Sequence, residues 1–386
     1  MSSDERATSD KSSRVLILGA SARAAAESAT RAGWSVVASD MFGDIDLRRI
    51  SEFVPIDNYP IDFKRVIEAF DLPTIYTGGL ENYSDLLDPI RTLWGNRSEQ
   101  LTKSRDPFWW TPRLHELGIN IATVYRHDSP TPNGKPVLKK PLHSAGGNGV
   151  ELVPQNQSVG SDHYLQEFIQ GDVLSAVFIG SRGDCRLCGV TQQVIWPGLT
   201  GTDFAYGGSV GPVELSRNAL DQLELIGSFL NSEAGLRGIF GVDFVLRSDD
   251  SVTPIEINPR YTASVEVLEI GFSQSLLLPH HAAFKGEAYP MSNRQEPQFV
   301  AKIILYASDR TVIDHNLDQQ DMPVGVRLAD IPSAGSVIDA NHPICTVVAP
   351  AGSLNEACDK ARQVADLVPF ASFGSESLSA TAERSA

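Results

Sequence analysis

The chain has 386 residues, enough for two or three packed domains, and its hydrophobic share of 42% is ordinary for a globular protein. Its formal net charge of −16 argues against a nucleic-acid partner, because an acidic surface repels phosphate backbones. The sequence contains no apolar run long enough to span a membrane, and its polar first residues lack the apolar segment of a secretion signal. We therefore expect a cytoplasmic protein with no membrane partner.

The first hundred residues alternate short apolar strands with helices. The expected strands are Arg14–Leu18, Trp34–Ser39 and Thr74–Thr77, and the expected helices are Ala20–Gly33 and Phe63–Phe70. This alternation is typical of a parallel sheet with helices on both faces. It predicts a Rossmann-like, doubly wound α/β domain at residues 14–100, preceded by a disordered tail at residues 1–13.

A dinucleotide site is one interpretation of this first domain. Gly19 follows the first strand, and Asp40 lies 21 residues later, where such folds place a ribose-binding acid. The residues after Gly19 lack the second and third glycines of that fingerprint. A nicotinamide-dependent dehydrogenase is therefore an alternative, although it gives no role to the acidic strands found further along the chain.

After about Leu101 the pattern changes to successive strands. The strands expected there are Val137–Lys140, Val150–Val153, Tyr164–Ile169, Leu174–Ile179, Cys185–Ile195, Gly238–Leu246 and Val252–Ile257, with a helix at Ala219–Ala234. Strand following strand predicts an α+β core with an antiparallel sheet. We expect this core at 101–295, with a small lobe at about 101–165 and a large lobe at about 166–295. A small C-terminal α/β cap at 296–370 and a disordered tail at 371–386 complete the expected organisation.

Acidic residues interrupt two of the apolar strands in the core. Asp243 lies in GVDFVL, and Glu256 and Asn258 lie in TPIEINPR. Strand side chains alternate in direction, so Glu256 and Asn258 face one side, and a hairpin can bring Asp243 beside them. Two carboxylates and an amide oxygen suit Mg²⁺, and Arg260 could stabilise charge that develops in a transfer reaction. Two edge strands with polar side chains in water are the alternative, but they would not explain acids within such apolar strands.

Two further segments have the character of a nucleotide site. In KKPLHSAGGNGV, Lys140 ends a strand, and Gly146, Gly147 and Gly149 permit a backbone that wraps phosphate oxygens. The segment is not a Walker loop, and a flexible hairpin with exposed lysines is its alternative interpretation. In QEFIQGD, residues 166–172, an extended backbone could bind an adenine edge and Asp172 the ribose, although a plain core strand is the alternative.

Taken in this order, the three segments resemble the ATP-grasp superfamily, whose acid…E-x-N-x-R signature is similar to Asp243, Glu256, Asn258 and Arg260. The resemblance implies ATP and Mg²⁺ as cofactors, with Mn²⁺ as a substitute, and a direct part in the chemistry for Lys140 and Arg260. The residues that it implies for ATP binding are Lys103, Lys140, Ser144, Gly146, Gly147, Gly149, Gln166, Glu167, Phe168, Ile169 and Asp172. Two departures stand out. Gln166 takes the place of the usual acid in the hinge, and Val173 falls where the ribose contact usually lies.

The resemblance covers roughly residues 14–370 and extends to a carboligase-like subgroup related to biotin carboxylase, which includes a tyramine–glutamate ligase of methanofuran synthesis. It implies a carboxylate–amine ligase that activates a small-molecule carboxylate as an acyl phosphate, releases ADP and joins the acyl group to an amine in cofactor biosynthesis. It is also compatible with a homodimer. A bicarbonate-using carboxylase and a non-catalytic ATP sensor are the alternatives.

Other residues have less specific interpretations. Loops of the first domain would form one wall of the acceptor site, with Asp40 and Glu81 as candidate substrate contacts, and Tyr206 and Gly207 could line the same cleft. Solvated loops are the alternative for all four. Cys185 and Cys188 form a C-x-x-C that could be half of a zinc site or a redox pair, but no second pair follows at zinc-site spacing.

Overall fold

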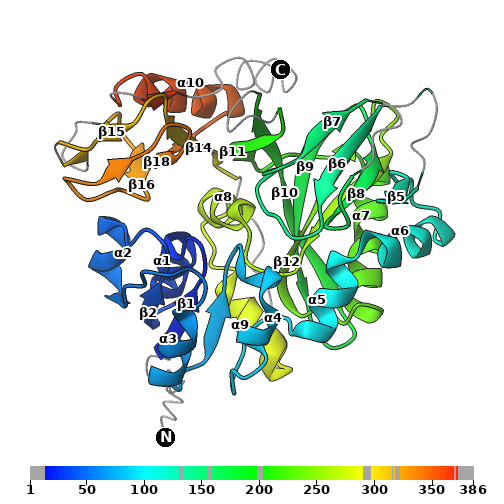
Figure 1. The fold of residues 1–386 in the computed structure, drawn as a ribbon, viewed down its shortest axis with the longest axis horizontal. Coiled ribbons are helices and arrows are strands. Elements are labelled where there is room, and N and C mark those ends of the chain that lie inside the picture. Colours follow the sequence, from blue (N-terminus) through cyan, green and yellow to red (C-terminus); the bar gives the residue numbers. More distant parts are fainter. Residues whose placement is uncertain are drawn as a thin grey trace, which may run out of the picture.

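The structure, a computed structural model, describes a three-part molecule. The residues described are 14–129, 134, 136–154, 159–197, 203–289, 297–314, 316–317, 322–368 and 371–372, so the expected tail at 1–13 lies outside them. Figure 1 shows the N-terminal sheet and the C-terminal strands on one side, the core on the other, and helix α8 (Ala263–Gly271) between them. Within the described residues, no helix combines the length and the apolar character needed to cross a bilayer.

The N-terminal domain is a four-stranded parallel sheet in the order β3-β2-β1-β4, which confirms the predicted Rossmann-like fold. Its elements are β1 (Arg14–Leu18), α1 (Arg23–Arg31), β2 (Ser35–Ser39), α2 (Ile45–Ile50), β3 (Glu52–Phe53), α3 (Phe63–Ala69), β4 (Thr74–Tyr76), η1 (Leu80–Asn82) and α4 (Ser84–Leu87). The apolar run of β1 is fully buried, as a central strand of such a sheet requires. The carboxyl ends of these strands form the edge at which open α/β sheets bind ligands.

Helices α5 (Ser98–Arg105) and α6 (Pro107–Glu116) lead from this domain into a small antiparallel sheet. Its strands, in the order β5-β8-β6-β7, are Val124–Arg126, His163–Glu167, Val137–Pro141 and Glu151–Val153. Trp110 and Leu114 of α6 pack in the core of the large lobe, although their segment was expected to belong to the small lobe. The small lobe is therefore mainly this sheet, and its glycine loop connects β6 to β7.

A second sheet of nine antiparallel strands forms the body of the molecule. Its main path, β13-β12-β9-β10-β11-β14-β18-β16, comprises Val252–Asn258, Gly238–Leu246, Asp172–Gly180, Cys185–Trp196, Ala205–Gly211, Phe299–Ala307, Pro343–Ala351 and Arg327–Ala329. The helices α7 (Arg217–Ser232), α9 (Leu277–Lys285) and α10 (Leu354–Ala365) complete the described helices. A separate ribbon pairs β15 (Thr311–Val312) with β17 (Val337–Ile338).

The C-terminal segment continues this sheet. Strand β14 pairs with β11 of the core, so the boundary expected near residue 296 is no break in the strand ladder. Two residues of the expected C-terminal tail, Ala371 and Ser372, instead form β19 against β14. The remainder of that tail lies outside the described residues.

A buried ion network, which we call the junction network, joins the three parts. Arg23 of α1 is fully buried and binds Glu266 of α8, and it also bonds to Asp330 at 2.9 Å. Lys302 of β14 lies 2.6 Å from Glu266. Burial alone would raise the pKa of Glu266, but Arg23 and Lys302 hold it well below its usual range. The network therefore keeps its charges compensated without water.

The cysteines of the C-x-x-C motif lie on opposite faces of the large sheet. A β-bulge interrupts β10 between Leu187 and Gly189. Cys188 is buried in the core that contains Val177, whereas Cys185 packs against the core that contains Phe178. The two side chains therefore belong to different cores, one on each face of the sheet. Neither cysteine takes part in a disulfide.

Candidate functional site

The acidic strands form the predicted hairpin. Asp243 of β12 pairs directly with Glu256 of β13, and Gly241 pairs with Asn258. The side-chain amide of Asn258 donates to Asp243 Oδ2 at 2.9 Å, and Ser175 Oγ donates to Oδ1 at 2.6 Å. The three expected ligands therefore share one face of the large sheet, held by hydrogen bonds from their own strands and from β9.

The electrostatics of this face favour a bound cation. Burial raises the pKa of Asp243 to about 6, and the negative charge of Glu256 contributes to the rise. In the described part of the chain, no group of three or more His, Cys, Asp and Glu side chains is arranged to hold a metal. Two carboxylates and one amide remain, a set that fits Mg²⁺ because this ion binds few protein ligands and completes its shell with water and phosphate oxygens.

Lys140 reaches the same face from the small lobe. Its Nζ donates to Gln166 Oε1 at 3.2 Å and to the Ile255 carbonyl at 3.0 Å. Burial alone would lower the pKa of Lys140, but Tyr164 and Glu256 raise it above its usual value. The side chain is therefore a fixed cation next to the acidic pair. Gln166, the predicted hinge residue, accepts a hydrogen bond from this lysine.

A cavity of about 210 Å³ lies between the two lobes. Its apolar part includes Phe168, Ile169, Val173 and Phe204. The predicted residues that line it are Lys140, Gly146, Gly147, Gln166, Glu167, Phe168, Ile169, Tyr206, Asp243, Glu256, Asn258 and Arg260. Segments that are far apart in the sequence thus meet in one cleft, which combines a flat apolar portion with a strongly charged end.

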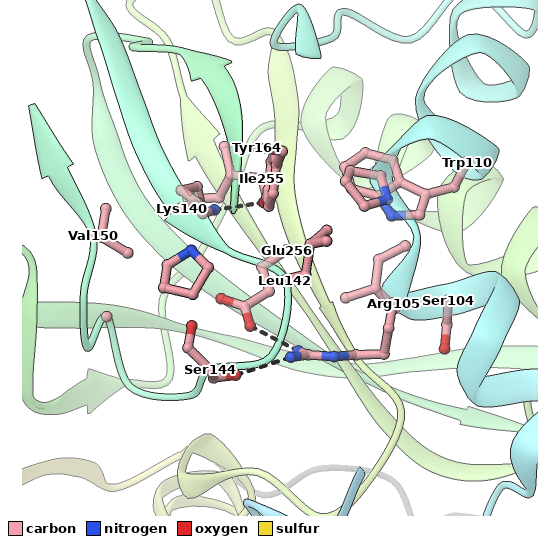
Figure 2. A pocket seen from close by; sticks show the side chains of 14 residues that line it. Ser104, Arg105, Trp110, Lys140, Leu142, Ser144, Val150, Tyr164, Ile255 and Glu256 are labelled. Carbon is pink, nitrogen blue, oxygen red and sulfur yellow. Dashed lines mark hydrogen bonds and ion pairs between the residues drawn. The ribbon is translucent and has the colours of Figure 1, made fainter. Parts of the chain in front are cut away.

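A smaller cavity of about 30 Å³ adjoins it and shares Lys140, Gly147 and Glu256 with it. Figure 2 shows this cavity, with Arg105 pointing toward Glu256 and Ser144. Arg105 Nη1 bonds to Glu256 Oε1 at 3.0 Å, and Nη2 donates to the Ser144 carbonyl at 2.9 Å. Ser144, a predicted ATP-binding residue, therefore lines the smaller cavity and contacts Arg105 through its backbone carbonyl.

Arg105 is the residue that the sequence interpretation missed. Lys103, the residue predicted from this segment, bonds to Glu99 and to the Glu233 carbonyl and, among the described residues, is absent from the lining of both cavities. The two side chains are two positions apart on α5 and so point in different directions. The basic segment was recognisable in the sequence, but the phase of the helix relative to the cleft was not.

Three other predicted nucleotide contacts, Asp172, Gly149 and Glu167, differ in their position relative to the cavities. Val173 lines the larger cavity, whereas Asp172 is not among the described residues that do. Gly149 also lies outside both linings, although its φ of 73° fits the predicted turn. Glu167 lines the cavity, and its carboxylate accepts a hydrogen bond from Thr123.

The four candidate substrate contacts lie in different surroundings. Both carboxylate oxygens of Asp40 accept backbone N–H groups, from Ala22 at 2.9 Å and Gly43 at 2.8 Å among others, so this acid organises the strand-end loops. That arrangement also leaves the dehydrogenase alternative without its ribose ligand. Tyr206 lines the larger cavity, whereas Gly207 packs against Trp196.

Glu81, the fourth candidate, is covered and pairs with Arg260. Its Oε1 accepts from Arg260 Nε at 2.7 Å, and within the described residues its buried Oε2 has no hydrogen-bond partner. Arg260 also donates to Asn258 Oδ1 at 3.1 Å. Glu81 therefore orients Arg260 from the N-terminal domain, and the guanidinium reaches the cavity next to the acidic pair.

Sequence comparisons point in the same direction as this geometry. Residues 106–264 match the ATP-grasp domain family. An uncharacterized protein of Methanocaldococcus jannaschii is 23% identical over 364 residues, which cover 87% of this chain and 88% of that protein. The D-alanine–D-alanine ligase of Beijerinckia indica is 26% identical over 189 residues, 44% of this chain and 56% of the relative. The match to the carbamoyl phosphate synthase large chain of Paenarthrobacter aurescens, 26% identical over 34% of this chain, covers 13% of that protein.

Solved structures share the whole architecture. A biotin carboxylase from Campylobacter jejuni superimposes with a TM-score of 0.74 at 14% identity and covers 95% of each chain. The biotin carboxylase domain of the Hydrogenobacter thermophilus 2-oxoglutarate carboxylase, solved with MgADP and bicarbonate, gives a TM-score of 0.71 at 14% identity and covers 93% of this chain and 90% of that one. At such identities the likeness shows a common fold.

Proposed function

We propose that this chain is an ADP-forming ligase that joins a small-molecule carboxylate to an amine, because residues 106–264 match the ATP-grasp domain family. The observation that carries the proposal is the pairing of Asp243 with Glu256 opposite Lys140 in a cleft that also has an apolar portion. Such a cleft can hold a base in its apolar part and phosphates at its charged end. The D-alanine–D-alanine ligase among the relatives supports an amide-forming reaction.

The proposed reaction has two steps. An oxygen of the substrate carboxylate attacks the γ-phosphorus of ATP, so that a C–O–P linkage forms and ADP leaves. The amine nitrogen then attacks the carbonyl carbon, the C–O bond to phosphate breaks with its electron pair, and the nitrogen loses a proton as the amide forms. Asp243, Glu256 and Asn258 would hold Mg²⁺, which would supply positive charge next to the transferred phosphate.

The side chains of this protein position the reacting groups and neutralise their charge. Lys140, held by Gln166 and the Ile255 carbonyl, presents its ammonium to the phosphates. Arg260, held by Glu81, is placed to stabilise the transferred group and the oxyanion of the second step. The glycine loop between β6 and β7 covers the charged end and keeps water from the acyl phosphate. No nucleophile from the protein is required.

The substrate pair is testable by a matrix of carboxylates and amines, scored by ADP release and by product mass. Glutamate with tyramine or a related amine comes first, because the resemblance found in the sequence points to that pair and to cofactor biosynthesis of the methanofuran kind. ADP release that needs both a carboxylate and an amine, together with a product of the condensed mass, supports the ligase. A matrix with no pair-dependent ADP release contradicts it.

The rival carboxylase has one observation in its favour, the fold shared with biotin carboxylase domains, one of them solved with bicarbonate. It predicts ADP release that depends on bicarbonate without any amine. Omitting bicarbonate from degassed buffer, and then restoring it, separates the two reactions. A nucleotide sensor predicts ATP binding with no ADP release under either condition.

A further inference from the structure

Arg105 connects three separate parts of the molecule at the predicted metal site. Its guanidinium bonds to Glu256 Oε1 in the large lobe at 3.0 Å, to the Ser144 carbonyl in the glycine loop at 2.9 Å, and to Asn82 Oδ1 of the N-terminal domain at 3.1 Å. The side chain of Arg105 is 13% exposed. Figure 2 shows the first two of these bonds meeting at one guanidinium. The contact is therefore a multiply bonded ion pair in which Arg105 is largely shielded and the Glu256 side chain is 29% exposed.

This ion pair uses a carboxylate that a metal would also need. An arginine keeps its charge at any physiological pH, so it cannot leave Glu256 by losing a proton. A divalent cation on the same carboxylate would meet a fixed positive charge at close range, which shielding from water makes more costly. A metal on the Oε1 oxygen of Glu256 therefore requires Arg105 to move. A phosphate group, with more negative charge and several oxygens, is a stronger partner for a guanidinium than one carboxylate oxygen.

We propose that Arg105 stands in for the metal on Glu256 when nucleotide is absent, so that a free divalent cation is excluded and enters together with a nucleotide whose phosphates draw Arg105 away. The proposal rests on the proposed function, because it takes Glu256 as a metal ligand. It makes Arg105 a positioning residue that sets the order of loading. The protein then holds no metal in a site that has no phosphate to activate.

The same movement acts on the glycine loop. When Arg105 leaves Glu256, its bonds to the Ser144 carbonyl and to Asn82 are lost or remade together, because all three come from one planar group. The loop is thereby held in the empty state and released when the charged ligand arrives. Metal entry and loop freedom are coupled through a single side chain.

The test measures metal binding in the absence of nucleotide. Mn²⁺ is titrated into the full chain by electron paramagnetic resonance, comparing the native protein with Arg105→Gln. We expect Arg105→Gln to bind Mn²⁺ about tenfold more tightly, because the competing cation is gone. Arg217→Gln is the matched control: it removes one arginine charge at an exposed site on α7 and should leave the affinity unchanged. Equal Mn²⁺ affinity in the native protein and Arg105→Gln overturns the proposal.

A second pair of variants separates this inference from the proposed function. The double variant Arg105→Gln/Glu256→Gln should lose the gained Mn²⁺ affinity. If the double variant keeps that affinity, the cation lies elsewhere, and the metal assignment to Glu256 fails together with this inference. If Glu256→Gln abolishes binding of Mn²⁺ with ATP while Arg105→Gln leaves free Mn²⁺ binding unchanged, the exclusion role of Arg105 alone is wrong.

A third variant tests whether Arg105 restrains the glycine loop. It also keeps the proposal testable if Arg105→Gln folds poorly. Arg105→Lys keeps the positive charge, so Mn²⁺ affinity should stay near the native value, but its shorter, compact ammonium lacks the planar fork with which Arg105 reaches all three partners. Amide hydrogen exchange over residues 143–149 should rise several-fold in this variant without ligand, because the Ser144 carbonyl has lost its donor. Native exchange rates over that segment in Arg105→Lys would show that Arg105 does not restrain the loop.

Discussion

Asp243 and Glu256 are direct cross-strand partners in the β12–β13 hairpin, so two carboxylates face each other on a half-buried surface. Such a pair is unfavourable by itself, because like charges opposite each other repel. The protein stabilises it with Asn258 and Ser175 as donors to Asp243 and with Arg105 on Glu256. The hairpin is thus built for a further positive charge, and the predictions below follow from that.

Removing Glu256 should abolish phosphate activation while the fold is kept. Glu256→Ala deletes one of the two carboxylates, and we expect ADP formation to fall by about 100-fold or more. Asp250→Asn, in the exposed turn that follows β12, removes the same charge away from the cleft and should retain native activity. A coupled ADP assay with circular dichroism as the fold check measures both. Native ADP formation in Glu256→Ala would refute the metal assignment.

The ionisation of Asp243 should make the metal-free protein less stable as pH rises. Its pKa is raised from 3.8 to about 6, so the folded state binds more protons than the unfolded state between these values. The free energy of unfolding must then fall as pH rises from about 4 to about 6, and the loss persists above that. Asp243→Asn removes this penalty, so its unfolding free energy relative to native should improve by about 1–3 kcal/mol across this window.

Denaturant unfolding in EDTA, at pH 4 and at pH 7, measures how the difference in unfolding free energy between Asp243→Asn and the native protein changes with pH. Groups that titrate equally in both proteins, such as His280 with its pKa of about 4, cancel in the comparison. A constant difference between the two proteins at both pH values would mean that Asp243 does not carry the raised pKa.

Adjacent lysines should differ sharply in nucleotide binding. Lys140 is buried beside Glu256, whereas Lys139 pairs with Glu151 on the partly exposed opposite side of the same strand. Lys140→Met should weaken ATP binding about 10–100-fold, since it removes a charge-assisted contact to phosphate. Lys139→Met should change it less than about threefold. Isothermal titration with a non-hydrolysable ATP analogue compares them, and similar losses in both variants would remove Lys140 from the phosphate site.

Two glycines of the same loop should tolerate a methyl group differently. Gly147 has a φ of 76°, and a Cβ there would lie 1.9 Å from the Phe204 carbonyl oxygen, whereas Gly146, with a φ of 68°, has nothing within 4 Å. Gly146→Ala should therefore cost only backbone strain, about 1 kcal/mol. Gly147→Ala must also push the loop away from residues 203–206. We expect the KM for ATP to rise several-fold more in Gly147→Ala, and equal effects would show that the loop does not rest on Phe204.

The sequence identified the acidic hairpin because its determinants are local. Alternation within a strand and a short turn are enough to place Asp243, Glu256 and Asn258 on one face. The glycine loop and the strand before it were recognisable for the same reason. The side of α5 that faces the cleft could not be predicted in this way. Choosing between Lys103 and Arg105 requires knowledge of how α5 packs against the cleft, which no nearby residue encodes.

Contacts between segments far apart in the sequence could not be predicted either. Strand β14 joins β11 across a long stretch of chain, so the C-terminal strands were assigned to a cap although they extend the main sheet. Asp40 occupies the position of a ribose-binding acid, but its oxygens are filled by backbone donors that only the folded loops bring together. The covered pair of Glu81 and Arg260 likewise joins two domains through a contact that only the tertiary fold creates.

The junction network sets a limit on how this protein could be recombined. Arg23 comes from the first helix, Glu266 from the middle of the chain, and Asp330 and Lys302 from its last third. A chimera that takes its C-terminal strands from a relative inherits only some of these charges, and Arg23 or Glu266 left without a partner is a buried, uncompensated ion. Successful grafts should therefore exchange the first helix and the last strands as one unit, although they stand at opposite ends of the coding sequence.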